Sequence, residues 1–170
     1  MNNIIAKEEA APASDENVWN GSLRKMTLDD YDAVFELWDK TEYVSLNECD
    51  TRDGMAFYLK HNPDSCFVAE ADGRIVGTVL CGHDGRRGFL RHLVIAKAYR
   101  NKGIGTQLVA QCLAVLSSKG VGKCNIFVNS ENVRGLEFWK QAGWYMVDEE
   151  FVTMQSPTAP LTMPKAVASS

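Results

Sequence analysis

The chain has 170 residues, of which 45% are hydrophobic, and its net charge is −4 at pH 7. A chain of this length and apolar content can form one globular domain with a sizeable core. The negative net charge gives no basic field for a nucleic acid or an anionic membrane surface, and no run of apolar residues is long enough to predict a membrane span. We therefore expect neither a nucleic acid nor a membrane as a partner.

Cysteine and histidine usage indicates the compartment and the metal chemistry. The five cysteines are widely spaced and include no C-x-x-C pair. Four of them lie in apolar patterns, where a reduced thiol behaves as a small hydrophobic side chain; these are Cys66, Cys81, Cys112 and Cys124. The start lacks the basic and apolar regions of a signal peptide, which predicts a cytoplasmic protein. The three histidines show no metal-ligand spacing, which predicts no metal site.

The first residues of the chain lack periodicity. Residues 1–21 are rich in Ala, Glu, Asp and Asn and are expected to form a disordered extension. A short strand is expected at 22–26, and Thr27 with Asp30 then resembles the capping box that begins a helix. The apolar side chains of this helix share one face; they are Leu28, Tyr31, Val34, Phe35 and Trp38.

Strands and helices alternate through the rest of the chain. Periodicity and turn signals predict a helix at 51–60, strands at 66–71, 74–81 and 89–95, a helix at 104–119, a strand at 124–128, a helix at 130–142 and short strands at 144–147 and 151–154. Hairpins mixed with helical crossovers predict one α/β (α+β) domain over 22–155, with a mixed, mostly antiparallel sheet of about seven strands and helices on both faces. Residues 156–170 are rich in Pro, Ala and Ser and predict a flexible tail.

A glycine-containing turn joins the strand at 89–95 to the next helix, and it reads Arg100-Asn101-Lys102-Gly103-Ile104-Gly105-Thr106. Glycines let the backbone curl tightly and approach a ligand closely. The free N–H groups and positive dipole end of the following helix suit a phosphate or pyrophosphate, and Arg100 and Lys102 add positive charge. The Walker pattern is absent, and Leu108 stands where the dinucleotide pattern G-x-G-x-x-G has its third glycine. The turn therefore predicts a site for a different phosphorylated cofactor.

Two blocks of the sequence resemble the GNAT superfamily of N-acetyltransferases. The turn matches the family's acetyl-CoA loop, [R/Q]-x-x-G-x-[G/A], and the block from Asn129 to Trp144 is similar to N-x-x-A-x-x-[F/L]-Y-x-x-x-G-F. One helix and one strand separate the blocks, as in the family, and the resemblance spans residues 23–155. It implies a GNAT-like domain with splayed central strands and acetyl-CoA as the donor substrate.

The resemblance also implies where acetyl-CoA binds. In the family, backbone groups of the strand before the loop pair with the pantetheine arm and polarise the acetyl carbonyl; those positions are Leu93, Val94 and Ile95 here. The loop from Arg100 to Thr106 would hold the pyrophosphate. Asn132 matches a position that commonly contacts the cofactor, although a polar residue in the first turn of a helix also bonds locally, so both interpretations stay open.

Two positions depart from the family pattern. Trp139 stands where relatives carry the tyrosine usually proposed to protonate the coenzyme A thiolate, and an indole N–H cannot deliver a proton at neutral pH. Phe127 replaces the carboxylate that many relatives carry on the preceding strand. Catalysis must therefore use other groups or depend largely on proximity.

Three sites are candidates for the base that accepts the amine proton. His92 lies beside Leu93 on the splayed strand, and imidazole suits proton transfer near neutral pH; core packing is its alternative role. Glu48 lies in the loop that usually covers the acceptor pocket, although a surface carboxylate needs no such role. His83-Asp84 also fits a turn-capping pair.

The sequence as a whole predicts direct transfer of an acetyl group from acetyl-CoA to a primary amine of a small molecule or protein. A non-catalytic acyl-CoA-binding or interaction module on the same fold is the alternative, which Trp139 and Phe127 favour. Many relatives pair through their last strands, and the apolar residues 151–154 favour a homodimer through such an edge.

Overall fold

The computed structural model of the chain describes residues 19–147, and the strands in this range form one sheet. The strands follow one another across the sheet in chain order: β1 (Ser22–Lys25), β2 (Phe67–Ala71), β3 (Arg74–His83), β4 (Gly88–Ile95) and β5 (Cys124–Ile126). Neighbours are antiparallel from β1 to β4, whereas β5 is parallel to β4. A parallel pair needs a crossover connection, and α3 (Ile104–Ser118) supplies it.

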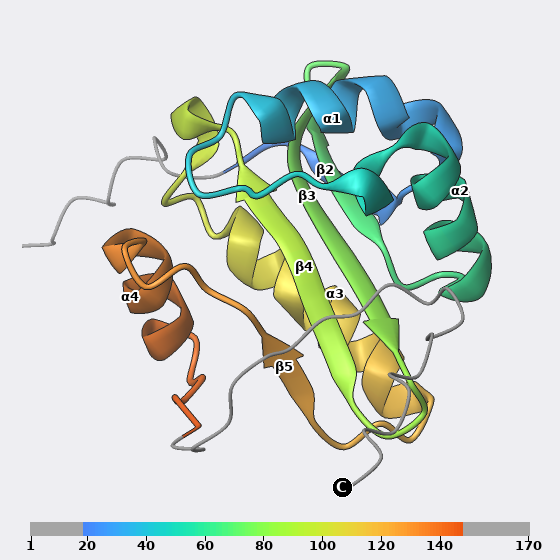
Figure 1. Ribbon diagram of the computed structural model, residues 1–170. Helices are drawn as coiled ribbons and strands as arrows, with labels where there is room; N and C mark the ends of the chain where they lie inside the picture. The colour runs from blue at the N-terminus through green and yellow to red at the C-terminus, as the bar shows by residue number, and fades with distance from the viewer. Residues whose placement is uncertain (1–18, 148–170) are drawn as a thin grey trace, which may run out of the picture.

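Helices cover both faces of the sheet (Figure 1). α1 (Tyr31–Asp39) and α2 (Arg52–His61) lie on one face, α3 lies on the other, and α4 (Val133–Gln141) follows β5. Three short 3-10 turns lie between these elements: η1 (Leu28–Asp30), η2 (Glu48–Asp50) and η3 (Lys97–Tyr99). No helix within residues 19–147 is long and apolar enough to cross a membrane.

Each face of the sheet has its own apolar cluster. The α3 cluster joins Ile104 and Leu108 to side chains of β2, β3 and β4, and α4 contributes Phe138 to its edge. The α1/α2 cluster contains Trp38 and Met55, both almost fully buried. Because both faces are covered, the central strands are apolar on both sides, as sheets with helices on each face require.

The predicted fold class is confirmed, but the predicted number of strands is not. The described residues form five strands instead of about seven. Residues 144–147 were expected to form a strand, yet they have no neighbouring strand here: Tyr145 and Met146 are exposed, while Trp144 packs edge-on against Trp139. An apolar run becomes a strand only where a neighbour satisfies its backbone groups. The strand predicted at 151–154, and with it the dimer edge, lies outside the described residues.

Caps explain why two helices begin later than the sequence predicts. Thr27 and Asp30 form the predicted capping box, with the Thr27 N–H donating to the Asp30 carboxylate at 2.8 Å, but this box begins η1, and α1 starts only at Tyr31. The helix predicted at 130–142 begins at Val133, because the Asn132 side chain is its N-cap. A capping residue lies outside the helix that it begins.

The Asp30 carboxyl is buried, and its pKa lies below the usual range. Burial raises this pKa, but hydrogen bonds from the Arg24 guanidinium and from the Thr27 N–H outweigh that effect. Ionised Asp30 therefore stabilises the fold above the unfolded-state pKa of about 3.9. This contribution is lost as the pH falls through the lower folded-state value.

Asp30→Asn should accordingly lower the free energy of unfolding near pH 7 by about 1–3 kcal/mol, the range for a buried hydrogen-bonded group that loses its partner. The difference from the wild type should shrink below about pH 4, because the Asp30 carboxyl of the unfolded wild type then begins to bind a proton while that of the folded protein is still ionised. Urea unfolding of both proteins at several pH values measures this. A difference that stays constant into strong acid would contradict the assigned ion pair with Arg24.

Candidate functional site

A cleft lies among the described residues where the pairing of β4 with β5 ends. These strands pair only as far as Leu90 and Ile126, whereas β4 continues to Ile95. The α1–α2 connection, β4 and the first turns of α3 and α4 line the cleft. Its volume of about 3240 Å³ exceeds the roughly 300–1,000 Å³ of a typical small-ligand pocket, so it has room for a long donor and an acceptor together.

The second half of β4 offers its backbone to this cleft. Leu93 and Ile95 pack at the edge of the α3 cluster, and Val94 is buried in the α1/α2 cluster. All three line the cleft, and beyond Leu90 no strand among residues 19–147 pairs with the β5 side of β4. Their side chains therefore belong to the core, while the backbone on the β5 side of β4 is open to an extended ligand, except for the Ile95 carbonyl, which accepts from Arg100.

The first turn of α3 presents free amides to the same cleft. Gly103 is the N-cap and has a φ of 74°, a left-handed conformation that glycine adopts without steric cost. Within the described chain, no acceptor takes the N–H groups of Ile104, Gly105 and Thr106, and the first amide to be bonded is that of Gln107, to the Gly103 carbonyl at 3.1 Å. Free amides at the positive end of a 15-residue helix suit an anionic group.

The two cations of the loop have different surroundings. Arg100 Nε donates to the Ile95 carbonyl at 3.0 Å, which ties the loop to the end of β4, and Arg100 lines the cleft together with Asn101. Lys102 is not among the residues that line the cleft; its ammonium lies 5.7 Å from the centre of the Tyr99 ring. Of the two cations, Arg100 is therefore the one that lies where a phosphate group in the cleft could be bound, as the sequence predicts.

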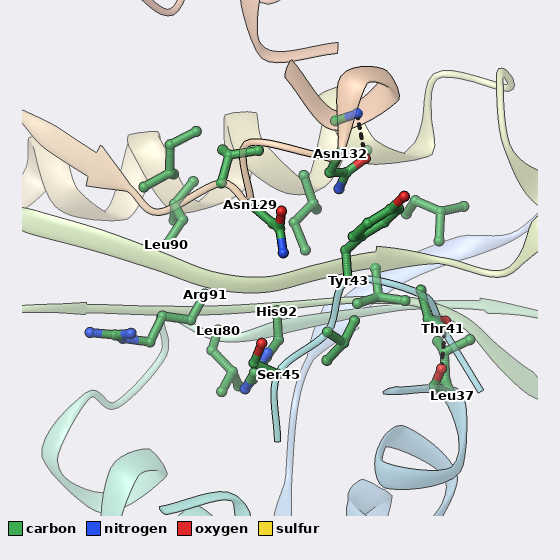
Figure 2. A pocket seen from close by; sticks show the side chains of 18 of the residues that line it. Leu37, Thr41, Tyr43, Ser45, Leu80, Leu90, Arg91, His92, Asn129 and Asn132 are labelled. Carbon is green, nitrogen blue, oxygen red and sulfur yellow. Dashed lines mark hydrogen bonds between the residues drawn. The ribbon is translucent and has the colours of Figure 1, made fainter. Parts of the chain in front are cut away.

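The α4 side of the cleft holds polar and aromatic groups. Asn132 Oδ1 accepts the Gly135 N–H at 2.8 Å, so the local interpretation of this residue describes a real contact, yet Asn132 also lines the cleft. Figure 2 shows Asn129 and Asn132 on one side of the opening and Tyr43 with Ser45 on the other. Trp139 packs edge-on against Phe138 and Trp144, so it belongs to a cluster of aromatic side chains.

A β-bulge changes which way the middle of β4 faces. The pairing with β3 shifts register after Thr78, and His92, opposite the shift, has a φ of 48°. Leu90 and Leu93 consequently both pack in the α3 cluster, although strict alternation would place residues three apart on opposite faces. The bulge thus places His92 on the α1/α2 face, where its ring lies 4.4 Å from that of Trp38.

His92 is paired with a carboxylate that the sequence analysis missed. Its Nε2 lies 2.8 Å from Asp50 Oδ1, and the two side chains are 14% and 8% exposed. Both residues line the cleft. An ionised carboxylate only accepts hydrogen bonds, so a neutral imidazole facing it would carry its proton on Nε2 and leave Nδ1 as the acceptor. This is the arrangement that a general base requires.

Asp50 occupies its position because of a second capping box. Asn47 is the N-cap of η2, and Asp50 Oδ2 accepts the Asn47 N–H at 2.9 Å. The tetrapeptide Asn47-Glu48-Cys49-Asp50 has the same form as the box at Thr27 and Asp30, so the local geometry could have been predicted. The pairing with His92, 42 residues away, is a tertiary contact without a sequence signal.

The other candidate bases lie in different settings. Glu48 lines the cleft but is exposed, and no hydrogen bond engages its side chain within residues 19–147. His83 and Asp84 lie outside the cleft and cap their own turn: Asp84 Oδ1 accepts the N–H groups of Arg86 and Arg87, and His83 Nδ1 accepts that of Gly85. Of the three candidates, His92 alone has a carboxylate that orients it.

Known proteins resemble this chain in sequence and in fold. Residues 31–144 match the family model described as the acetyltransferase (GNAT) family. An acetyltransferase of Sodalis glossinidius is 29% identical over 126 residues, which cover 74% of this chain and 88% of that protein. An acetyltransferase of Yersinia pestis (strain Pestoides F) is 32% identical over 110 residues, covering 65% and 77%. The crystal structure of PaiA N-acetyltransferase from Thermoplasma acidophilum with coenzyme A has a TM-score of 0.67 at 18% identity, covering 78% and 94%.

Proposed function

The chain belongs to the acetyltransferase (GNAT) family and is an N-acetyltransferase, and from this premise we propose that it moves an acetyl group from acetyl-CoA directly to a primary amine of a small molecule or a protein. The observation that carries the proposal is a single cleft where three features meet. These are the free amides at the start of α3, the side of β4 that has no pairing strand beyond Leu90, and the imidazole of His92. Direct transfer needs only these groups and two substrates held side by side.

The residues present suit the pyrophosphate and the pantetheine arm of the donor. The pyrophosphate suits the amides from Asn101 to Thr106, because they converge at the positive end of α3 and Gly103 leaves the approach open. The pantetheine arm contains amide groups, and such groups can pair with the open edge of β4 as an added strand would. The acetyl group would then lie near the bulge at His92.

The transfer step forms one bond and breaks another. The neutral amine nitrogen attacks the thioester carbonyl, a C–N bond forms, and the C–S bond breaks with the electron pair leaving on sulfur. The proton lost by the nitrogen is accepted by Nδ1 of His92 and passes later to solvent. Trp139 supplies no acid for the thiolate, because an indole N–H does not ionise near neutral pH.

Binding of acetyl-CoA at the loop is tested by Gly103→Val. A β-branched residue at a φ of 74° is strained and moves the amides that receive the pyrophosphate. We expect the affinity for acetyl-CoA, measured by calorimetry, to fall at least about tenfold, which corresponds to the loss of about 1.4 kcal/mol.

Gly120→Val is the matched control for this variant. Gly120 has nearly the same φ, 77°, but lies after the other end of α3 and outside the cleft. The control should suffer similar backbone strain and keep its affinity. Equal affinity in both variants would contradict the loop assignment. Turnover is measured separately, by mass spectrometry of a panel of amines, and binding of acetyl-CoA without any acetylated amine would favour the non-catalytic alternative.

A further inference from the structure

We propose that Asp50 is the positioning residue of this enzyme: its carboxylate fixes the tautomer and the orientation of His92, so that Nδ1 accepts the proton of the acceptor amine. This inference rests on the proposed function, because it names the group that prepares the proposed base. The juxtaposition that carries it is the pair of His92 Nε2 and Asp50 Oδ1, 2.8 Å apart at the edge of the cleft.

The two oxygens of Asp50 have separate tasks. Oδ2 accepts the Asn47 N–H and completes the cap of η2, while Oδ1 faces His92. A cap needs only one oxygen, so the second bond is not required by the local fold. Among residues 19–147, His92 is also the only residue whose side chain lies within hydrogen-bond distance of the Asp50 carboxylate.

Asp30 shows what the same motif does without an imidazole. It is also the third residue of a capping box, and it is 8% exposed, against 7% for Asp50. Apart from a bond from the Thr27 hydroxyl, its remaining bonds go to the guanidinium of Arg24, a permanent cation, and it does not line the cleft. In the box that ends at Asp30, the carboxylate therefore forms a structural ion pair with Arg24. In the box that ends at Asp50, the carboxylate faces His92, the only histidine among the described residues that lines the cleft.

Neighbouring groups hold both members of the pair in place. The Tyr31 hydroxyl donates to the Asp50 carbonyl at 2.9 Å, which fixes the backbone of the carboxylate. The Thr78 hydroxyl donates to the His92 carbonyl at 3.0 Å, and the Trp38 ring packs against the imidazole at an interplanar angle of 40°. With the backbone and the ring plane set, the carboxylate decides which nitrogen carries the proton.

Asp50→Asn separates these tasks. A carboxylate offers acceptors to both N–H groups, whereas an amide has one oxygen and cannot serve Asn47 and His92 together. The Asn47 backbone N–H cannot change, but the imidazole can move its proton to Nδ1 and accept from the amide instead. The nitrogen that should take the amine proton is then blocked, although the loop keeps its cap.

The experiment combines a spectrum with kinetics and uses Asp30→Asn as the matched control. Nitrogen NMR of the wild type should show His92 with its proton on Nε2, the signal being assigned by its disappearance in His92→Gln. Asp50→Asn should lose that preference and lower kcat by about 10–100-fold, below the full effect of removing a general base, with the KM for acetyl-CoA unchanged. Asp30→Asn should leave the spectrum and the kcat of the folded fraction near wild type.

Three results would overturn the proposal. One is a wild-type His92 that carries its proton on Nδ1, a measurement that needs no variant and stands even if Asp50→Asn does not fold. Another is a kcat for Asp50→Asn equal to that of Asp30→Asn. The third is a drop in kcat without any change in the His92 spectrum, which would mark Asp50 as structural only. Failure of the proposed function is a different outcome, because the wild type would then acetylate no amine at all.

Discussion

His92→Gln is expected to lower turnover by about 10²–10⁴-fold, the usual effect of removing one general base, with the affinity for acetyl-CoA near the wild-type value. Glutamine is polar and of similar length, but its amide cannot accept a proton near neutral pH. Affinity should persist because the free amides at the start of α3 and the edge of β4 do not depend on the His92 side chain. Single-turnover kinetics and calorimetry on the same preparation measure the two quantities.

The bulge requires a second variant, because His92 has a left-handed backbone with a φ of 48°. Asparagine adopts this conformation more readily than glutamine does, and neither has a basic nitrogen. If the imidazole is the base, His92→Asn should be as inactive as His92→Gln. If the bulge alone matters, the asparagine variant should recover most of the turnover.

Glu48→Gln is the matched control, because Glu48 is the other candidate base that lines the cleft. It removes a carboxylate from the same cleft, two residues from Asp50, at an exposed side chain. We expect its turnover to stay within a few-fold of the wild type. If His92→Gln kept its turnover while Glu48→Gln lost it, the base would be Glu48 and His92 would be a packing residue.

The geometry of the loop from Arg100 to Thr106 could be predicted because its residues are contiguous in the sequence. A strand, a turn with glycines and a helix follow one another between Gly88 and Ser118, so the free amides at the start of α3 are implied by neighbouring residues alone. The positive φ of Gly103 is what such a turn requires. The mixed sheet with helices on both faces followed from the same kind of local pattern.

The pair of His92 and Asp50 could not be predicted in the same way. Simple alternation along β4 would place His92 on the same face as Leu90, in the α3 cluster. The bulge reverses this, and the only local hint is the pair of polar residues, Arg91 and His92, inside an apolar strand. A register shift depends on how β3 and β4 pack between their helices, which no short stretch of sequence encodes.

The edge of the sheet shows a related limit. Residues 144–147 have the composition of a strand, but they pair with no strand within residues 19–147, and the strand predicted at 151–154 lies outside the described residues. Likewise Trp139 could be recognised as a departure from the tyrosine of the family, while its packing between Phe138 and Trp144 needed the structure.

Trp38→Ala should have the largest effect on stability, lowering the free energy of unfolding by about 3–5 kcal/mol. Trp38 is fully buried, and it is the largest side chain in the α1/α2 cluster. A domain of this size has a total stability of about 5–15 kcal/mol, so the variant should be partly unfolded at physiological temperature. Urea unfolding followed by circular dichroism measures the change, and a loss below about 1 kcal/mol would contradict the packing described here.

Trp38→Phe tests whether this tryptophan also supports the site. Its Nε1 donates to Thr78 Oγ1 at 2.8 Å, and that hydroxyl donates in turn to the His92 carbonyl. Phenylalanine keeps an aromatic ring beside His92 but removes the first donor, which should cost about 1–3 kcal/mol of stability. Because the Thr78 hydroxyl still has its acceptor at the bulge, turnover of the folded fraction should stay within about tenfold of the wild type, far from the loss expected for His92→Gln. A turnover as low as that of His92→Gln would instead mean that the indole N–H, through Thr78, is what holds the bulge in its active form.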